Sequence, residues 1–324
     1  MENTITRNTN TVTERNFTMN NEWSNRRVPS SGVGIDISSA GTVAHALYMG
    51  GLDYQVATRP IYTENGTEIP KYRRILRTDS NKTFGVVKDN YKPIQNAEAF
   101  AFADALVNKG ARLDRMGGLK DGEFVWMQLT LPETKVNNEP YTPYVFLSTG
   151  HDGKHGMMAS LGAFRAFCCN QIRLVMAHSD YRVNVNHKGD VMLKVQEANR
   201  VMAESNSYID QFKQVASDLR NTTLANTEVD TIINRLVPIT DKDRESEKTV
   251  DALIEERNRI RYIYVNAPDL QNEGYNGYRL LNAVSDYESH WTPQRNTRTW
   301  RDNRLVKLNT SKATMTNKVF ELLR

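Results

Sequence analysis

The sequence predicts an α+β protein in which an antiparallel β-meander sheet with packed helices is followed by a mainly helical C-terminal region. Two observations support this prediction. In the first half, short segments rich in β-branched and aromatic residues alternate with polar turns. From Asp190 onward, apolar residues instead recur every three or four positions, which is the period of an amphipathic helix. The length of 324 residues allows one large domain or two ordinary ones.

We expect three segments along the chain. Residues 1–25 are rich in Asn and Thr and lack periodicity, which is typical of a flexible tail. An α+β sheet domain then spans residues 26–189, and a helical domain with a basic C-terminal segment spans residues 190–324. The sequence has neither a long apolar run nor the apolar core of a signal peptide, so we expect a cytoplasmic protein without a membrane partner.

The sheet domain is predicted to begin with a short helix and a meander. TVAHALYMGG predicts a helix that Thr42 caps and that the glycine pair ends. Three strand-like segments follow, separated by polar turns, at residues 54–62, 71–78 and 83–91. NAEAFAFADALVNKG then predicts one helix over residues 96–110, with Asn96 as its cap and Gly110 at its end.

A hairpin and further strands complete the predicted sheet. ARLDRMGGL and EFVWMQLTL predict a hairpin with a glycine turn, and YVFLSTG and MMASLGAFRAF predict two strands joined through HDGKHG. NQIRLVMAHS, residues 170–179, predicts a short helix with Asn170 as N-cap, and YRVNVNH, residues 181–187, predicts a last strand. Helices are then predicted over residues 191–220, 228–237, 247–265 and 274–291.

The only two cysteines, Cys168 and Cys169, stand side by side between a predicted strand and a predicted helix. Adjacent cysteines have poor geometry for an ordinary disulfide, and a zinc site needs about four ligands at a spacing that this sequence lacks. A metal site and thiol chemistry are the alternatives. We favour packing, because free cysteines are among the most buried residues and the neighbours include Phe164 and Phe167.

The segment HDGKHG, residues 151–156, is the strongest candidate for an enzymatic site. His151, Asp152 and His155 are residue types that bind metals or act as general acids and bases. Asp-Gly is also a strong turn signal between two strands, and we favour that interpretation. No complete glycine-rich nucleotide motif occurs in the sequence. We therefore expect no metal, no cofactor and a binding protein rather than an enzyme.

Positive charge is concentrated in three segments, although the net charge of the chain is only +4. Residues 59–92 contain eight Lys or Arg against four Asp or Glu, residues 151–194 contain six against three, and residues 295–324 contain eight against two. The last segment has arginines at every third position, namely Arg295, Arg298, Arg301 and Arg304. Segregated positive charge is typical of a protein that binds nucleic acid. The alternative is that these are solvated faces that discourage strand pairing.

Aromatic residues are interleaved with the basic ones, and sheets that present both are the usual platform for single-stranded bases. We therefore predict a single-stranded nucleic-acid site in which Lys and Arg hold phosphates and Tyr stacks on bases. Its residues are Arg73, Arg74, Arg77, Lys88, Tyr91, Arg165, Tyr181, Arg182 and Lys188. On its strand, Arg74 points away from Arg73 and Arg77, and the apolar pattern does not indicate which face is exposed.

The order of motifs along the chain resembles the domain-of-unknown-function family 932, whose members are labelled phage/plasmid-like proteins. The motifs are an early Trp, a strand entry GLDYQV, a helix start YKPIQN, a turn STGHDG, a corner RAFCCNQ and a strand VNHKG. They lie at Trp23, Gly51–Val56, Tyr91–Asn96, Ser148–Gly153, Arg165–Gln171 and Val185–Gly189. NGYRLLNAVSDYESHW is similar to a later helix of the family. Cys168 is an additional cysteine here, Asn186 stands where the family has an Arg, and the Trp-His pair usual after the first Trp is missing.

The resemblance implies a bacteriophage origin and therefore the cytoplasm of the bacterial host, and it supplies no catalytic residue. Such genes often lie with replication and recombination genes, and a meander with helices is similar in kind to single-strand annealing recombinases. We expect a homo-oligomeric protein that binds or anneals single-stranded nucleic acid in replication or recombination. The alternative is a non-enzymatic protein–protein interaction factor directed at a host component. An enzyme that uses the HDGKHG side chains is the third hypothesis.

Overall fold

A computed structural model describes residues 30, 32–165, 170–176, 180–182, 191–291 and 299–324. For residues 180–182 and 191–195 it describes the backbone but not the side chains. The predicted N-terminal tail, the Cys168–Cys169 pair and Lys188 lie outside the described residues.

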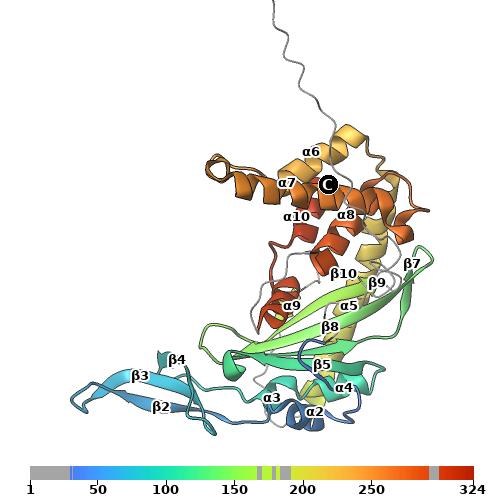
Figure 1. The fold of residues 1–324 in the computed structure, drawn as a ribbon. Coiled ribbons are helices and arrows are strands. Elements are labelled where there is room, and N and C mark those ends of the chain that lie inside the picture. Colours follow the sequence, from blue (N-terminus) through green and yellow to red (C-terminus); the bar gives the residue numbers. More distant parts are fainter. Residues whose placement is uncertain (1–29, 31, 166–169, 177–179, 183–190, 292–298) are drawn as a thin grey trace, which may run out of the picture.

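The main sheet is antiparallel throughout and confirms the predicted β-rich first half (Figure 1). The strands lie side by side in the order β1-β5-β6-β8-β9-β10. Two short strands pair outside this order, β7 with β8 and β11 with β9. The strands are β1 (Ile35–Asp36), β5 (Arg112–Leu119), β6 (Phe124–Thr130), β7 (Thr134–Val136), β8 (Glu139–Gly150), β9 (Met158–Arg165), β10 (Gln171–Ile172) and β11 (Asp180–Arg182).

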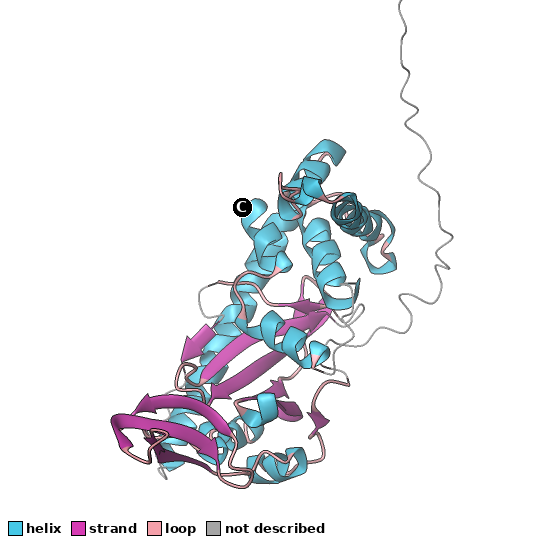
Figure 2. Ribbon diagram, turned by 60° about the vertical axis from the view of Figure 1, so that its left-hand side comes forward, coloured by secondary structure: helices cyan, strands magenta, loops and turns pink. Residues whose placement is uncertain are grey.

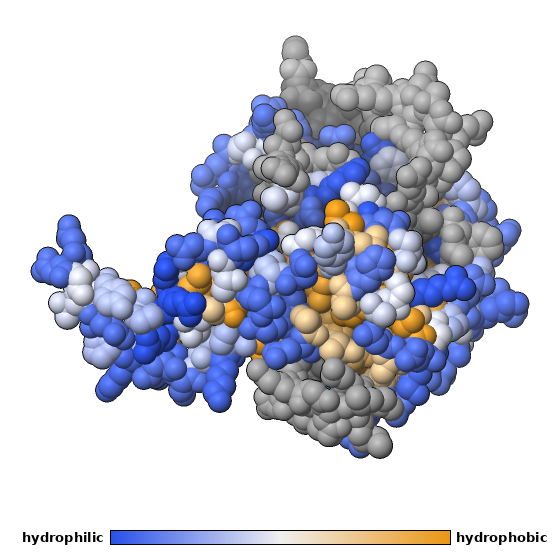
Figure 3. Space-filling view, turned by 90° about the horizontal axis from the view of Figure 1, so that it is seen from below, coloured by the Kyte–Doolittle hydropathy of each residue, from blue (hydrophilic) through white to orange (hydrophobic). Residues whose placement is uncertain are grey.

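A second, three-stranded antiparallel sheet projects from the body, and we call it the β-arm (Figure 1). It consists of β2 (Val56–Tyr62), β3 (Glu68–Arg77) and β4 (Thr83–Lys88), in the order predicted for the meander. Viewed from below, the β-arm extends away from the body and its visible surface is largely hydrophilic (Figure 3).

Helices precede, interrupt and follow the main sheet. Those of the first half are α2 (Val43–Gly50), α3 (Asn96–Phe100) and α4 (Ala103–Val107), with a 3₁₀ turn at Lys120–Gly122 between β5 and β6. Those of the second half are α5 (Val191–Asn221), α6 (Asn226–Leu236), α7 (Glu247–Asn266), α8 (Gly277–Asp286), α9 (Trp300–Thr310) and α10 (Met315–Leu322). Short turns lie at Asp243–Glu245 and Pro268–Leu270, and a π-helical turn, Tyr287–Trp291, extends α8.

Each face of the main sheet has its own apolar cluster, because strand residues alternate between the two faces. On β6, Val125 and Met127 belong to the large core that includes residues of the long helix α5, which runs along one side of the sheet (Figure 2). Trp126 points to the other face, where its ring stacks on Phe146 with centroids 5.5 Å apart. Leu305 of α9 packs against this aromatic face.

The large core continues from the sheet region into the helical region. Ala198, Val201 and Phe212 of α5 are buried in the same cluster as sheet residues, and the cluster extends to Tyr278 of α8. The Tyr141 hydroxyl of β8 lies 2.5 Å from the Tyr278 hydroxyl, so side chains of the two regions meet directly.

Two predicted helices differ from the structure. The segment predicted as a helix over residues 170–179 begins with strand β10, and Asn170 is buried rather than an N-cap. The reason is pairing with the edge of β9, where Arg165 donates its backbone N–H to the Asn170 carbonyl at 3.1 Å. The predicted single helix over residues 96–110 is divided into α3 and α4. Asn96 does not cap it, because its side chain turns inward and donates to the Leu52 carbonyl at 2.8 Å.

Candidate nucleic-acid interface

Strand register determines which side chains share a face of the β-arm. Arg59, Arg74 and Val86 are direct cross-strand partners on β2, β3 and β4, and Tyr72 pairs with Lys88 two residues along. These residues lie on one face, which we call the outer face. Pro60, Arg73 and Val87 form the corresponding row of the opposite face, and Ile75 also lies on that inner face.

The inner face packs against the body of the protein at the HDGKHG turn. Ile75 is fully buried. The backbone of Gly85 lies so close to the turn that a Cβ atom on Gly85 would be 2.6 Å from the Asp152 carbonyl oxygen. The two adjacent valines show the contrast, because Val87 packs against the core while Val86 is 58% exposed. The outer face is therefore the one available to a ligand. Leu76, nearer the root of the β-arm, is buried, so the exposed part of this face begins at the Arg59–Arg74 row.

Arg77 fixes the root of the β-arm and is not free to bind a phosphate. Its guanidinium donates to both carboxylate oxygens of Asp79, at 2.7 and 2.9 Å, and to the Asp121 carbonyl at 3.1 Å. It also lies 4.0 Å from the centre of the Tyr54 ring. The hydrogen bond to Asp79 raises the pKa of Arg77. Arg73, on the inner face, has its own carboxylate partner, Glu68, at 3.4 Å.

Arg59 and Arg74 behave differently, because their partners are neutral. Arg59 donates to the Thr58 carbonyl, and Arg74 donates to the Thr83 hydroxyl and the Asn81 side-chain oxygen. Within the described part of the chain, neither guanidinium is paired with a carboxylate. Like charges directly opposite each other on a sheet destabilise it. An anion bound between the two arginines would remove this repulsion.

A pocket of about 470 Å³ lies beside this pair, open to solvent. Its lining is Arg59, Pro60, Ile61, Tyr62, Arg74 and Asn81. Tyr62 is 56% exposed, so an aromatic ring accompanies the two unpaired cations. Phosphate groups and bases are bound by cations and exposed aromatic rings respectively.

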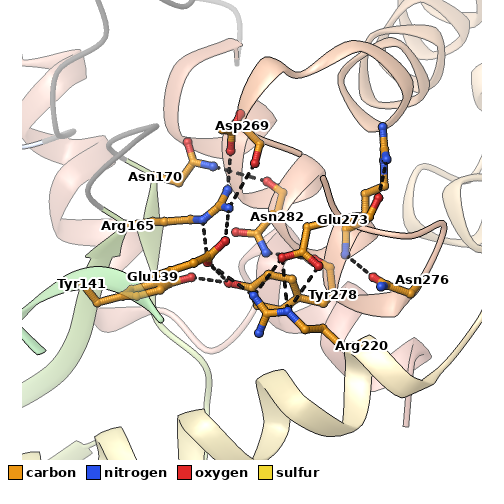
Figure 4. A network of polar contacts seen from close by, with 11 residues as sticks. Glu139, Tyr141, Arg165, Asn170, Arg220, Asp269, Glu273, Asn276, Tyr278 and Asn282 are labelled. Atoms are coloured by element: carbon orange, nitrogen blue, oxygen red, sulfur yellow. Dashed lines mark hydrogen bonds and ion pairs between the residues drawn. The ribbon is translucent and has the colours of Figure 1, made fainter. Parts of the chain in front are cut away.

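Arg165, predicted as a phosphate ligand, is instead buried in a polar network between the sheet and the helices (Figure 4). Its side chain is 1% exposed and donates to Glu139 at 2.6 and 3.1 Å. It also pairs with Asp269. Arginine on a strand is ambiguous from sequence, and here two carboxylates from distant segments hold the guanidinium inside. We therefore leave Arg165 out of the interface.

The same network links Glu139 to two further residues of the helical region. Glu139 accepts a hydrogen bond from the Tyr278 hydroxyl at 2.7 Å, and Arg220 lies 3.4 Å from the same carboxylate (Figure 4). Arg220 also stacks over the Tyr278 ring at 3.6 Å and pairs with Glu273 at 2.9 Å. Burial alone would raise the pKa of Glu139, but Arg165, the Tyr278 hydroxyl and Arg220 together outweigh burial and lower it.

The remaining predicted site residues are distributed as follows. Lys88 is exposed on the outer face with Arg74. Tyr91 is half-buried against the core, and burial, followed by the charge of Asp152, raises its pKa. Tyr181 and Arg182 lie on β11, where only the backbone is described. The predicted residues that the structure brings together are thus Arg74 and Lys88.

The HDGKHG turn separates its two histidines. His151 is 1% exposed, and its Nε2 lies 2.8 Å from the side-chain oxygen of Asn96, while burial lowers its pKa to about 4. His155 is largely exposed and pairs with Asp152 at 2.7 Å. Among the described residues no group of three His, Cys, Asp or Glu is placed to hold a metal ion. The turn interpretation is consistent with these contacts.

The basic C-terminal segment does not form one exposed stripe within its described part. Arg304 of α9 is half-buried and donates to the Glu288 carbonyl, and burial lowers its pKa. Arg301 is exposed, while Arg295 and Arg298 lie outside the described residues.

Two residues of the outer face, Arg59 and Tyr72, were missing from the predicted site, as was Tyr62, which lines the adjoining pocket. Arg59 and Tyr72 are basic or aromatic residues of the first basic segment, so their types were informative. Their placement depends on cross-strand register, which shifts at a bulge between Pro60 and Tyr62. The periodicity of a single strand does not contain this information.

A comparison with protein families identifies the family of this chain. The model of a family described as "Domain of unknown function (DUF932)" matches residues 83–312. No curated protein and no solved structure matches significantly. The matched span begins at Thr83, so it includes β4 but not β2 and β3 of the β-arm. None of the described helices is long and apolar enough to cross a membrane.

Proposed function

The chain belongs to the DUF932 family, and we propose that it binds single-stranded nucleic acid through the outer face of its β-arm. The observation that supports this proposal is the Arg59–Arg74 pair, two directly opposed cations without a carboxylate partner in the described residues. Such a pair favours an anionic ligand, and a phosphodiester backbone supplies evenly spaced anions.

The exposed aromatic residues favour a single strand over a duplex. Tyr62 and Tyr72 are 56% and 48% exposed, and both belong to the strands that carry the unpaired arginines. A base can stack on a tyrosine only when its π-face is accessible, which requires an unpaired nucleotide. Lys88, opposite Tyr72, adds a third cation to this surface.

The test compares two double variants that remove equal charge from the β-arm. Arg59→Gln with Arg74→Gln changes the outer face, whereas Arg73→Gln with Lys82→Gln removes two cations that are already paired with Glu68 and Asp121. Affinity for a single-stranded oligonucleotide is measured at several salt concentrations by fluorescence anisotropy. We expect the outer-face variant to flatten the logarithmic salt slope by about 1.4, which corresponds to two lost phosphate contacts.

The control variant should keep a slope close to that of the unaltered protein, and the losses should not depend on base sequence. Equal slopes for both variants would exclude the outer face. No binding by the unaltered protein would refute the proposal as a whole.

We extend the proposal to the biological role implied by the resemblance. The protein would bind or anneal complementary strands during phage replication or recombination in the bacterial cytoplasm, as a homo-oligomer. The annealing rate of two complementary oligonucleotides, with and without the protein, tests the activity. Light scattering with and without an oligonucleotide tests the assembly, and a monomer in both conditions would remove the oligomer from the proposal.

A protein–protein interaction factor directed at a host component is the second candidate. The exposed Val86, on the edge strand β4 beside Arg74 and Lys88, favours this alternative because an apolar side chain next to cations suits a protein surface. Association through such a patch would weaken much less with salt than phosphate binding. The same salt series therefore separates the two candidates.

A further inference from the structure

The pocket beside the Arg59–Arg74 pair has the dimensions and chemistry of a site for a single ligand unit. Its volume of about 470 Å³ lies within the range of roughly 300–1,000 Å³ that is usual for small-molecule sites. Its lining combines two cations, one aromatic ring, one amide and the apolar surfaces of Pro60 and Ile61.

The pocket is produced by an irregularity in the sheet. Between Pro60 and Tyr62 the register shifts, so that Tyr62 is opposite Glu68 although Pro60 is opposite Arg73. The partner strand accommodates the extra residues at Lys71, whose φ of 65° is unusual for a residue with a side chain. Bulges redirect side chains and increase local twist. Tyr62, at the end of this bulge, belongs to the lining of the pocket that Arg59 and Arg74 share.

The polar partners leave these groups able to bind a ligand. Arg74 uses two neutral acceptors, the Thr83 hydroxyl at 3.4 Å and the Asn81 oxygen at 3.2 Å, which are weak competitors for a phosphate. Arg59 donates to its neighbouring carbonyl and is exposed. The ring of Tyr62 is more than half exposed, as a stacking surface must be.

We propose that this pocket binds one nucleotide of a single strand, with its phosphate between Arg59 and Arg74 and its base stacked on Tyr62. This inference rests on the proposed function and adds a discrete position to it. The outer face would then hold most of the strand by charge alone, while one base is held by stacking.

The experiment is a double cycle of protein and strand. Unaltered protein, Tyr62→Ala and Tyr62→Phe are each titrated with oligothymidylate and with an abasic phosphodiester strand of equal length. We expect Tyr62→Ala to weaken oligothymidylate binding about tenfold, the order expected for one lost base stack, and to leave abasic binding unchanged. Tyr62→Phe should bind both strands as the unaltered protein does, because the phenyl ring retains the stacking surface.

Tyr48→Ala is the matched control, because Tyr48 is an exposed tyrosine on α2, outside the β-arm. Thermal unfolding of each variant establishes that it is folded. If Tyr62→Ala binds oligothymidylate normally, the pocket inference is wrong and the proposed function stands. Equal weakening on both strands would also overturn base stacking. Absence of binding by the unaltered protein to either strand would refute the proposed function itself.

A free nucleotide has the same phosphate and base, so thymidine monophosphate is the third probe. We expect its binding to be at least a hundredfold weaker than that of the strand, since it lacks the contacts along the outer face. Comparable affinity for the mononucleotide and the strand would overturn the assignment of the pocket to a strand.

Discussion

Replacing Arg165 by methionine should destabilise the protein without affecting nucleic-acid binding. The guanidinium is 1% exposed and is the partner of two largely buried carboxylates, Glu139 and Asp269. Removing one member of a buried ion pair typically costs about 3–5 kcal/mol, because a charge is left without a partner. Glu139 keeps the Tyr278 hydroxyl and Arg220, so we expect the lower end, about 3 kcal/mol.

The assay is chemical denaturation with a matched control and a rescue variant. Arg73→Met removes a partly exposed arginine whose partner Glu68 is 3.4 Å away, and it should cost less than about 1 kcal/mol. Combining Arg165→Met with Glu139→Gln and Asp269→Asn should recover most of the lost stability, since no buried charge then remains unpaired. If Arg165→Met is as mild as the control, the buried network contributes nothing and our reasoning is wrong. Loss of oligonucleotide affinity in folded Arg165→Met would return Arg165 to the interface.

The network also gives a pH dependence with a definite sign. The pKa of Glu139 is lowered below 4.5 in the folded protein, because Arg165, the Tyr278 hydroxyl and Arg220 together outweigh the opposing effect of burial. A lowered carboxyl pKa stabilises the fold above the unfolded-state pKa. This contribution is lost as the pH falls from about 4.5 through the lower folded value, and it should be absent from the Glu139→Gln variant.

Two further predictions concern the junction between the β-arm and the body. Gly85→Ala should cost about 1–3 kcal/mol in unfolding free energy, because its Cβ would meet the Asp152 carbonyl, whereas Gly156→Ala, with no atom within 4 Å, should change stability by less than about 0.5 kcal/mol. Equal effects would mean that the inner face is not tightly docked. Burial lowers the pKa of His151 from 6.5 to about 4 in the folded protein. As the pH falls below 6.5, this histidine is therefore protonated in the unfolded chain but not in the folded one. The free energy of unfolding should then fall by at most about 3 kcal/mol between pH 6.5 and 4. In His151→Gln this part of the pH profile, measured by thermal unfolding, should be flatter; an identical profile would contradict the assignment.

Sequence signals such as capping residues and apolar periodicity correctly predicted the elements whose formation depends on neighbouring residues in the chain. The start of α2 was correct because the Thr42 hydroxyl accepts from the His45 N–H, and its end was correct because Gly51 adopts a φ of 62°. The three strands of the β-arm and the long helix α5 were likewise confirmed, since alternation and helical periodicity were both strong.

The failures share a physical cause, which is long-range contact. Val86 and Val87 are chemically identical neighbours, and only docking of the inner face on the HDGKHG turn distinguishes them. Similarly, Arg165 is buried by Glu139 and by Asp269, which lies 104 residues later in the sequence. The helical pattern after Asn170 was overridden by pairing with β9. The candidate interface was therefore only partly predictable, because residue types indicated a basic surface while register and docking selected its members.

Residues near the end of the sequence pack against the main sheet, and this has a consequence during protein synthesis. Gln171 donates to Asn309 across 138 residues, the Val175 N–H donates to Asn317 across 142, and Leu305 packs on the aromatic face. Translation at about 5–20 residues per second separates the emergence of strand and partner by on the order of ten seconds. During that interval the face of the sheet that carries Trp126 and Phe146 lacks the packing of Leu305. We therefore expect a message truncated before α9 to yield a product that is more prone to aggregate than the full chain.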